Sequence, residues 1–165
     1  MRTDLRRPGD TRDIGGGGPA LFRLVRFWSR RWAAGAARQG AGDAAHVGRV
    51  LVLEAIDAAF ARGSAATADV AAELGLDRSN ASRMLADAVS AGLVTKTVSS
   101  GDARRTELGI TAEGRALLEA ARAWQEEVFL QLVAGWPAAD ARRFASYLKR
   151  LAAQSSNSVP TGGRT

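Results

Sequence analysis

Residues 67–114 read TADVAAELGLDRSNASRMLADAVSAGLVTKTVSSGDARRTELGITAEG, and their order of residue types is the most informative feature of the chain. Apolar residues recur at helical spacing up to Gly75, and a second run with the same spacing follows Asp77. Glycine commonly ends a helix in a left-handed conformation, and Asp commonly begins the next helix. The segment therefore predicts two short helices joined by a tight turn, a helix-turn-helix, with Thr67 as the cap of the first helix.

The second half of the segment predicts a β-hairpin. Residues 94–98 are rich in β-branched side chains, and after turn-forming residues at 99–102 the chain returns with Leu108 and Ile110 on one face. A hairpin directly after a helix-turn-helix is a wing, which can touch the backbone or minor groove of DNA while the second helix enters the major groove. Asp102 is expected to stiffen the wing tip by accepting hydrogen bonds from backbone or arginine groups.

The side chains expected to face DNA follow from the helical spacing. Ala81, Met84, Leu85 and Ala88 form the inward stripe of the second helix, so the polar residues between them point outward or flank that stripe. Short polar side chains near a helix start can approach base edges, and Arg or Lys can reach guanine or phosphate. A solvated helix face and an ordinary surface hairpin are the plainer alternatives, but neither explains why the two elements are adjacent. The candidate DNA contacts are Arg78, Ser79, Asn80, Ser82, Arg83, Lys96, Arg104 and Arg105.

Helices are expected on both sides of this segment. Apolar spacing predicts helices over about 19–37 and 45–61 before it, and two helices within about 112–153 after it, separated by Gly135-Trp136-Pro137. The chain is therefore predicted to be mainly α-helical, with about six helices and a two- or three-stranded β-wing. The helix over about 45–61 is expected to bury Val50, Leu53, Ile56 and Phe60.

The domain organisation follows from these elements. Residues 1–18 and 154–165 are rich in polar residues and glycine, and we expect disordered tails because such segments cannot bury enough surface to offset the ordering entropy. Residues 19–153 form one domain, with the winged helix-turn-helix at about 45–111. The flanking helices, about 19–37 and 112–153, carry aromatic surface that suits dimerisation. Tryptophans that fill the core of a monomer are the alternative.

Composition excludes several classes of function. The chain of 165 residues has no Cys and a single His, His46, which removes disulfides, thiolate chemistry and a multi-histidine metal site within one chain. No motif of an enzyme active site is present, so no catalytic residue, metal or cofactor is expected. No apolar run approaches the ~18 residues of a membrane span, and no signal peptide is evident, so a cytoplasmic protein without a membrane partner is expected.

The net positive charge of the chain favours a polyanionic partner, but the basic residues are not concentrated in the segment expected to bind DNA. The chain has a formal charge of +6 and a pI near 11.1. Residues 67–111, however, hold five basic and six acidic side chains, a net of −1. Much of the positive charge lies in the arginines of the first predicted helix. The near-neutral lobe keeps a second class open, a winged-helix protein-interaction module that does not read DNA sequence.

The chain resembles the MarR family of winged-helix transcriptional regulators. Four stretches carry the resemblance: residues 77–83 as the recognition helix, Ala91-Gly92-Leu93-Val94 as the entry to the wing, Gly101-Asp102-Ala103-Arg104-Arg105 as its tip, and residues 108–114 as its exit into a long helix. The resemblance covers about residues 19–153, and residues 67–114 are its most specific part.

This resemblance implies a homodimer whose terminal helices interlock and whose two winged lobes bind double-stranded DNA at a palindromic operator, most often as a repressor. Family members commonly bind small, often aromatic acids between the dimer helices and the winged lobe, so release by a small-molecule effector is a further expectation. Without cysteine, the thiol-oxidation branch of the family is excluded for this chain. The residues expected near an effector pocket are Trp28, Arg31, Trp32, His46 and Trp124.

Overall fold

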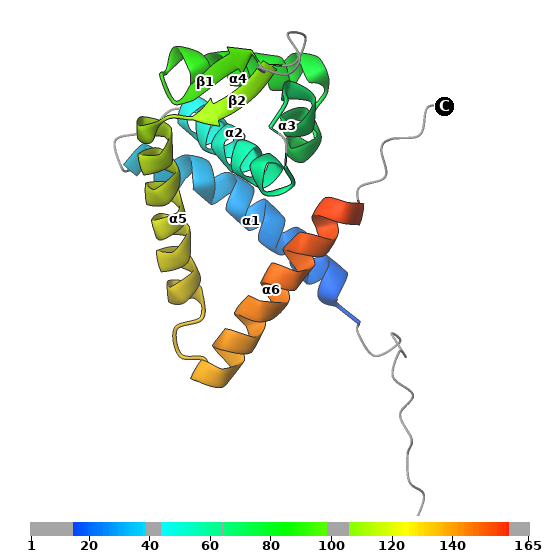
Figure 1. The fold of residues 1–165 in the computed structure, drawn as a ribbon. Coiled ribbons are helices and arrows are strands. Elements are labelled where there is room, and N and C mark those ends of the chain that lie inside the picture. The colour runs from blue at the N-terminus through cyan, green and yellow to red at the C-terminus, as the bar shows by residue number, and fades with distance from the viewer. Residues whose placement is uncertain (1–14, 39–43, 64, 99–105, 159–165) are drawn as a thin grey trace, which may run out of the picture. The chain divides into compact units, whose positions relative to one another are not determined.

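The computed structural model describes residues 15–38, 44–63, 65–98 and 106–158. Within these ranges the chain forms six α-helices and a two-stranded antiparallel sheet (Figure 1). The elements are α1 (Gly17–Arg38), α2 (Ala44–Ala61), α3 (Thr67–Leu74), α4 (Arg78–Ser90), β1 (Val94–Val98), β2 (Thr106–Ile110), α5 (Ala112–Leu132) and α6 (Ala138–Ser158). The mainly α-helical fold with a two-stranded wing confirms the predicted fold class.

The chain divides into two compact units, Met1–Val47 and Gly48–Thr165. In the first unit, α1 begins at Gly17, two residues before the predicted start at Pro19. Gly16 has a φ of 88°, and its carbonyl accepts a hydrogen bond from the backbone N–H of Ala20 at 3.1 Å. The glycine-rich stretch therefore leads directly into the helix, and Pro19 lies in the first turn, where its missing N–H costs no helical hydrogen bond.

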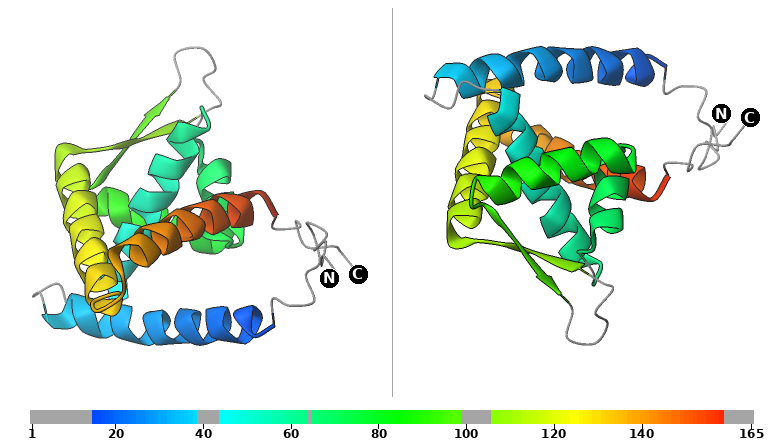
Figure 2. Two further views of the ribbon diagram at one scale, coloured as in Figure 1. Left: turned by 90° about the horizontal axis from the view of Figure 1, so that it is seen from below. Right: turned by 90° about the horizontal axis from the view of Figure 1, so that it is seen from above.

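The core of the second unit is built by the winged helix-turn-helix. It lies between the inward faces of α2, α3 and α4, the hairpin and the first turns of α5 (Figures 1 and 2). Val94 of β1 and Leu118 of α5 contribute to the same core. The largest fully buried side chains are Leu53, Ile56, Leu85, Leu108, Val50, Val52 and Val70.

The apolar stripe of α2 is buried as predicted except at its end. Val50, Leu53 and Ile56 are at most 2% exposed, whereas Phe60 is 52% exposed. The prediction for Phe60 is wrong because the last turn of α2 extends past the buried core, where the phenyl ring lines a surface cavity instead. Ala59, one position earlier, is fully buried at the edge of the core.

The turn between α3 and α4 forms as its glycine predicts. Gly75 ends α3 in the left-handed conformation at φ 63°, and the N–H groups of Gly75 and Leu76 donate to the carbonyls of Ala72 and Ala71. The start of α3 differs from the prediction, because Thr67 is the first helical residue and does not cap. The Asp69 carboxylate closes this end instead, accepting the backbone N–H of Ala66 at 3.0 Å.

The two strands of the wing pair in a register that begins at Val94↔Ile110 and ends at Val98↔Thr106. Leu108 is buried and Ile110 is half-buried, so both contribute to the inner face as predicted. On its other edge β2 meets the segment before α3, where Ala66 bridges Glu107 and the N–H of Leu108 donates to the Ala65 carbonyl at 3.1 Å. The base of the wing is therefore fixed on both sides.

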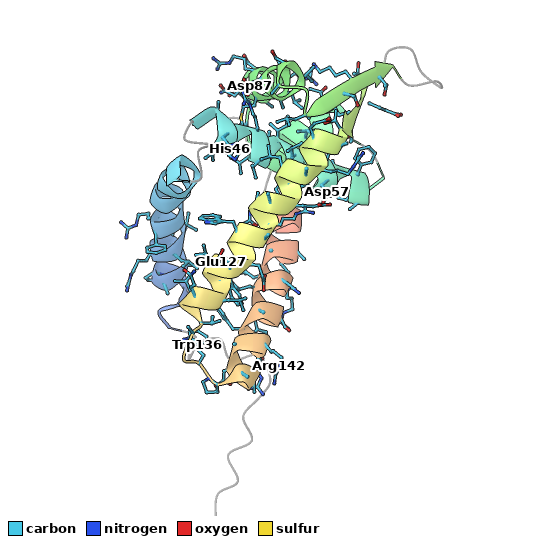
Figure 3. All side chains as sticks on the ribbon, turned by 90° about the vertical axis from the view of Figure 1, so that its left-hand side faces the viewer. His46, Asp57, Asp87, Glu127, Trp136 and Arg142 are labelled. Carbon is cyan, nitrogen blue, oxygen red and sulfur yellow. The ribbon has the colours of Figure 1, made fainter. Side chains whose placement is uncertain are left out.

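The last two helices are joined at an aromatic cluster. Gly135, at φ 90°, lies in the connection between α5 and α6, where Figure 3 shows Trp136, with Arg142 further on in α6. The Phe144 ring of α6 stacks on Phe129 of α5, with centroids 6.2 Å apart, and lies 5.3 Å from the Trp136 ring. α6 continues to Ser158, beyond the predicted helix end at 153. No helix in the described ranges is long and apolar enough to cross a membrane.

Candidate nucleic-acid interface

The outer face of α4 carries the polar residues that the helical spacing assigns to it. Asp77 begins the helix, and its carboxylate accepts the backbone N–H of Asn80 at 2.9 Å. Ala81, Leu85 and Ala88 are buried and Met84 is half-buried, which fixes the inward stripe. The opposite face then points to solvent by geometry. Its exposed members are Arg78, Ser79, Ser82 and Arg83, and Asn80 is half-buried at their edge.

Three of these polar side chains are joined along the edge of α4. The Nδ2 of Asn80 donates to the Asp77 carboxylate, and the Oδ1 of Asn80 accepts a hydrogen bond from the Arg83 guanidinium. The backbone N–H of Asn80, followed by the Asn80 side chain, lowers the pKa of the Asp77 carboxyl below its ordinary value, so the cap is ionised at neutral pH. Spacing alone predicts the shared face but not these hydrogen bonds.

An ion pair that sequence reasoning missed ties α4 to α2. The Arg49 guanidinium donates through Nε to Asp87 Oδ2 at 2.8 Å and through a second nitrogen to Oδ1 at 3.2 Å. Figure 3 shows Asp87 on α4. These hydrogen bonds lower the pKa of the Asp87 carboxyl. Because the partners are 38 residues apart, no local pattern predicts the pair.

We expect Asp87→Asn to lower the free energy of unfolding at neutral pH by at most about 1 kcal/mol, because the pair is partly exposed and screened by solvent. A carboxyl whose pKa is lowered in the folded state stabilises above its unfolded pKa, and the stabilisation is lost as pH falls through the lower folded pKa. The difference between the two chains should therefore shrink below the ordinary Asp pKa of 3.8. Urea unfolding at pH 7 and at about pH 3 measures it. A difference that does not change with pH would contradict this role for the ion pair.

The structure describes one of the predicted cations of the wing. Lys96 is exposed in the middle of β1, the strand that follows α4 and contacts it (Figure 1). Arg104, Arg105 and Asp102 lie outside the described residues, so their expected roles stay predictions. In the part of the chain that the structure describes, the candidate contacts thus come from α4 and from one strand of the wing.

A threonine and a glycine fix the chain where it leaves β2 and enters α5. Thr111 caps α5, its Oγ1 accepting the Gly114 N–H at 3.0 Å and donating to the Gly92 carbonyl at 2.8 Å. Its backbone N–H donates to the Leu93 carbonyl at 3.1 Å. A Cβ on Gly114 would lie 2.2 Å from that same carbonyl oxygen, so no larger residue fits without a backbone shift. The Thr-Ala-Glu-Gly sequence therefore joins the end of α4 to the start of α5.

A second ion cluster joins α5 to α2. The Arg122 guanidinium contacts the Glu54 carboxylate at 2.7 Å and the Asp57 carboxylate at 2.6 Å. The hydrogen bond that Arg122 donates to Glu54, followed by the one it donates to Asp57, raises the pKa of Arg122 further above its ordinary value. Arg122 also lines a cavity of about 380 Å³ between the last turns of α2, the end of β2 and the first turns of α5. Its other lining residues are Asp57, Phe60, Gly109, Ile110, Arg115, Leu118 and Glu119.

Neither His46 nor Trp124, the two residues of the expected effector pocket whose side chains the structure describes, lines this cavity. The side chains of Trp28, Arg31 and Trp32 lie outside those that the structure describes. His46 belongs to the first unit and Trp124, which is half-buried, belongs to the second. The expected pocket therefore stays a prediction. Among residues 15–38, 44–63, 65–98 and 106–158, no group of three His, Cys, Asp or Glu side chains is arranged to hold a metal ion.

Comparison with protein families agrees with this geometry. A model of the MarR family matches residues 48–105, which include the helix-turn-helix and β1. The search of curated proteins gave no sequence match.

Solved structures match over a longer part of the chain. A crystal structure of a MarR family transcription regulator is similar over 90% of this chain and 96% of its own, with a TM-score of 0.65 and 22% identity. The S. aureus MepR–DNA complex matches over 81% and 93% of the two chains, with a TM-score of 0.57 and 19% identity. S. aureus MepR bound to ethidium bromide matches over 82% and 94%, with a TM-score of 0.54 and 20% identity. These likenesses concern the fold.

Proposed function

We propose that this chain, which belongs to the MarR family, is a transcription regulator that binds a specific site on double-stranded DNA as a homodimer. The observation that carries the proposal is the exposed polar face at the start of α4, on a helix that also contacts the β1 strand of the wing. A helix held in this way can enter the major groove, while the wing reaches the adjacent backbone or minor groove. The likeness to MepR, whose complex with DNA is among the similar structures, supports it.

In this proposal the two kinds of contact are divided between α4 and the wing. Ser79, Asn80, Ser82 and Arg83 face base edges, which carry the sequence information. Basic residues around them contact phosphates or the minor groove, and they are Arg78, Lys96, Arg104 and Arg105. Because the lobe has few cations, we expect modest affinity and a modest dependence on salt.

The homodimer is supported by apolar surface that a single chain leaves uncovered. Large side chains on α5, α6 and their connection are about half exposed, although apolar residues of this size are usually buried. A second copy related by two-fold symmetry would cover them. Binding to a palindromic site then requires the two recognition helices to lie about 34–36 Å apart. The exposed residues are Leu130, Leu132, Trp136, Tyr147 and Leu151.

Selection of bound fragments from a random duplex library at near-physiological salt tests this function. We expect an enriched palindrome with half-sites about one helical turn apart, preferred over a scrambled duplex by ~10³-fold or more. Equal, weak and salt-sensitive binding to both duplexes would contradict the proposal. It would favour a winged-helix protein-interaction module, the class that the −1 charge of residues 67–111 keeps open.

We propose further that the chain represses transcription and that a small effector releases it from DNA. The cavity beside β2 is lined by the apolar side chains of Phe60, Ile110 and Leu118 and by charged residues of both signs, among which Arg115 offers a cation for a small aromatic acid. Titration of the enriched duplex with and without a panel of aromatic carboxylates tests this, with Arg115→Gln as the comparison. Compounds that bind the chain without changing its affinity for DNA would contradict release, and a reporter gene behind the enriched site gives the direction of regulation.

A further inference from the structure

The Asn80 side chain is hydrogen-bonded at both ends of its amide to residues of the same helix edge. Its backbone N–H and its Nδ2 both donate to the Asp77 carboxylate, and its Oδ1 accepts a hydrogen bond from Arg83. A side-chain amide has an NH2 group with two donors and an oxygen with two lone pairs, and here each group already has one partner. The three residues, at positions 77, 80 and 83, follow one edge of the helix at three-residue spacing.

This engagement restricts the way Asn80 can read DNA. An asparagine that recognises adenine presents its amide donor and its carbonyl acceptor to the base together. Asn80 would have to do so with its second N–H and its second lone pair, or give up its hydrogen bonds to Asp77 and Arg83. Each of these involves a charged group, and such hydrogen bonds are stronger than those between neutral groups.

Arg83 is in the opposite situation. A guanidinium has five N–H donors, and the hydrogen bond to Asn80 uses one Nη group. The remaining donors are enough for a bidentate contact with the O6 and N7 atoms of guanine. Arg83 is exposed, so without Asn80 its long side chain would sample many rotamers, and the hydrogen bond limits them before DNA arrives.

We propose that Asn80 is a positioning residue for Arg83 and does not read a base itself, so that this edge of α4 recognises a guanine through Arg83. The ionised Asp77 holds the amide of Asn80, and the amide holds the guanidinium. The inference rests on the proposed function, because it requires a chain that reads DNA. It changes the role expected for Asn80 from its position on the polar face.

The test is a double-mutant cycle read at every base pair of the enriched site. Dissociation constants are measured for the full chain, Asn80→Ala, Arg83→Ala and the double variant, each on the enriched duplex and on its single-base-pair substitutions. Ser90→Ala, an exposed position at the far end of α4, is the matched control for truncating the helix surface. Thermal unfolding of each variant shows whether the fold is retained.

We expect Arg83→Ala to remove the preference for one G·C pair, a loss of roughly five- to a hundred-fold. Asn80→Ala should weaken the preference at that same pair several-fold and should add nothing once Arg83 is absent. If Asn80→Ala instead lost preference at a different base pair, additively with Arg83→Ala, Asn80 would read its own base. That result would overturn this inference but leave the proposed function intact.

Two other results would also overturn it. An equal loss of affinity for all duplexes, with an unchanged preference, would reduce Asn80 to a structural role. A full-length chain with no preference at any base pair would overturn the proposed function and the positioning role with it.

Discussion

Gly114→Ala is expected to lower the free energy of unfolding by at least about 3 kcal/mol, the upper end of the range for overpacked sites. The added Cβ would lie 2.2 Å from the Leu93 carbonyl oxygen and 2.9 Å from the Ile110 Cγ2. Neither group can move away without losing other interactions, because the Leu93 carbonyl accepts a hydrogen bond from the Thr111 N–H and Ile110 is paired within β2. Relief would require α5 to separate from the base of the wing.

Gly48→Ala is the matched control, since it is the same substitution in another helix of the same unit. A Cβ there would meet only the Met84 Cε, at an ordinary 3.7 Å. Alanine favours a helix over glycine by about 0.5–1 kcal/mol, so this variant should be as stable as the parent chain or slightly more stable. Urea unfolding at a fixed protein concentration compares them, because a dimer's stability depends on concentration. Equal stability of the two variants would refute the close approach at Gly114.

Leu85→Ala should cost about 2–5 kcal/mol, the range for removing a leucine side chain from a packed core. Leu85 is fully buried and lies on α4 opposite the polar face. It therefore anchors the recognition helix to the core and is not itself one of the proposed base contacts. Below its unfolding midpoint the variant should keep the site preference of the parent chain, in contrast to Arg83→Ala.

Leu51→Ala provides the comparison, because Leu51 is 46% exposed on α2 and its truncation should change stability by less than about 1 kcal/mol. Thermal or urea unfolding gives the stabilities, and titration of the enriched duplex and its substitutions gives the preference. A Leu85→Ala chain that unfolds like the Leu51→Ala chain would contradict the anchoring role. A changed base preference in the folded variant would show that Leu85 also sets the position of α4 on DNA.

The winged helix-turn-helix could be predicted from the sequence because its determinants are local. Gly75 and Asp77 end one helix and begin the next within a few residues, and the β-branched run at 94–98 marks the first strand of the wing. The inward stripe of α4 follows from helical spacing alone. These signals depend on backbone conformation and on periodicity, both of which a short window of sequence contains.

The predictions that are wrong concern features that depend on residues far away in the sequence, or on which of two neighbouring side chains makes a hydrogen bond. Phe60 continues the apolar stripe of α2, but no periodicity shows that the core ends one residue earlier, at Ala59. Thr67 and Asp69 are both able to close the start of α3, and the carboxylate at the third helical position makes the hydrogen bond. Local sequence does not choose between them.

Contacts between remote residues were not predictable at all. Arg49 and Asp87 are 38 residues apart, and Arg122 and Glu54 are 68 apart. Charge patterning can pair side chains within one helix, but it cannot pair helices whose packing is not yet known. Within the candidate interface, spacing identified the polar face, whereas the engagement of Asn80 by Asp77 and Arg83 required side-chain geometry.

The closed base of the wing has a consequence for how such a chain can diverge. Thr111 is hydrogen-bonded to the Gly92 and Leu93 carbonyls, and β2 is hydrogen-bonded to the segment before α3, so the base of the wing is held by contacts outside the connection between the two strands. For a longer connection, closure entropy adds only about 0.6 kcal/mol for each doubling of its length. During evolution, the length and sequence of the wing tip can therefore change and create new contacts with the DNA grooves, while the position of the recognition helix is retained.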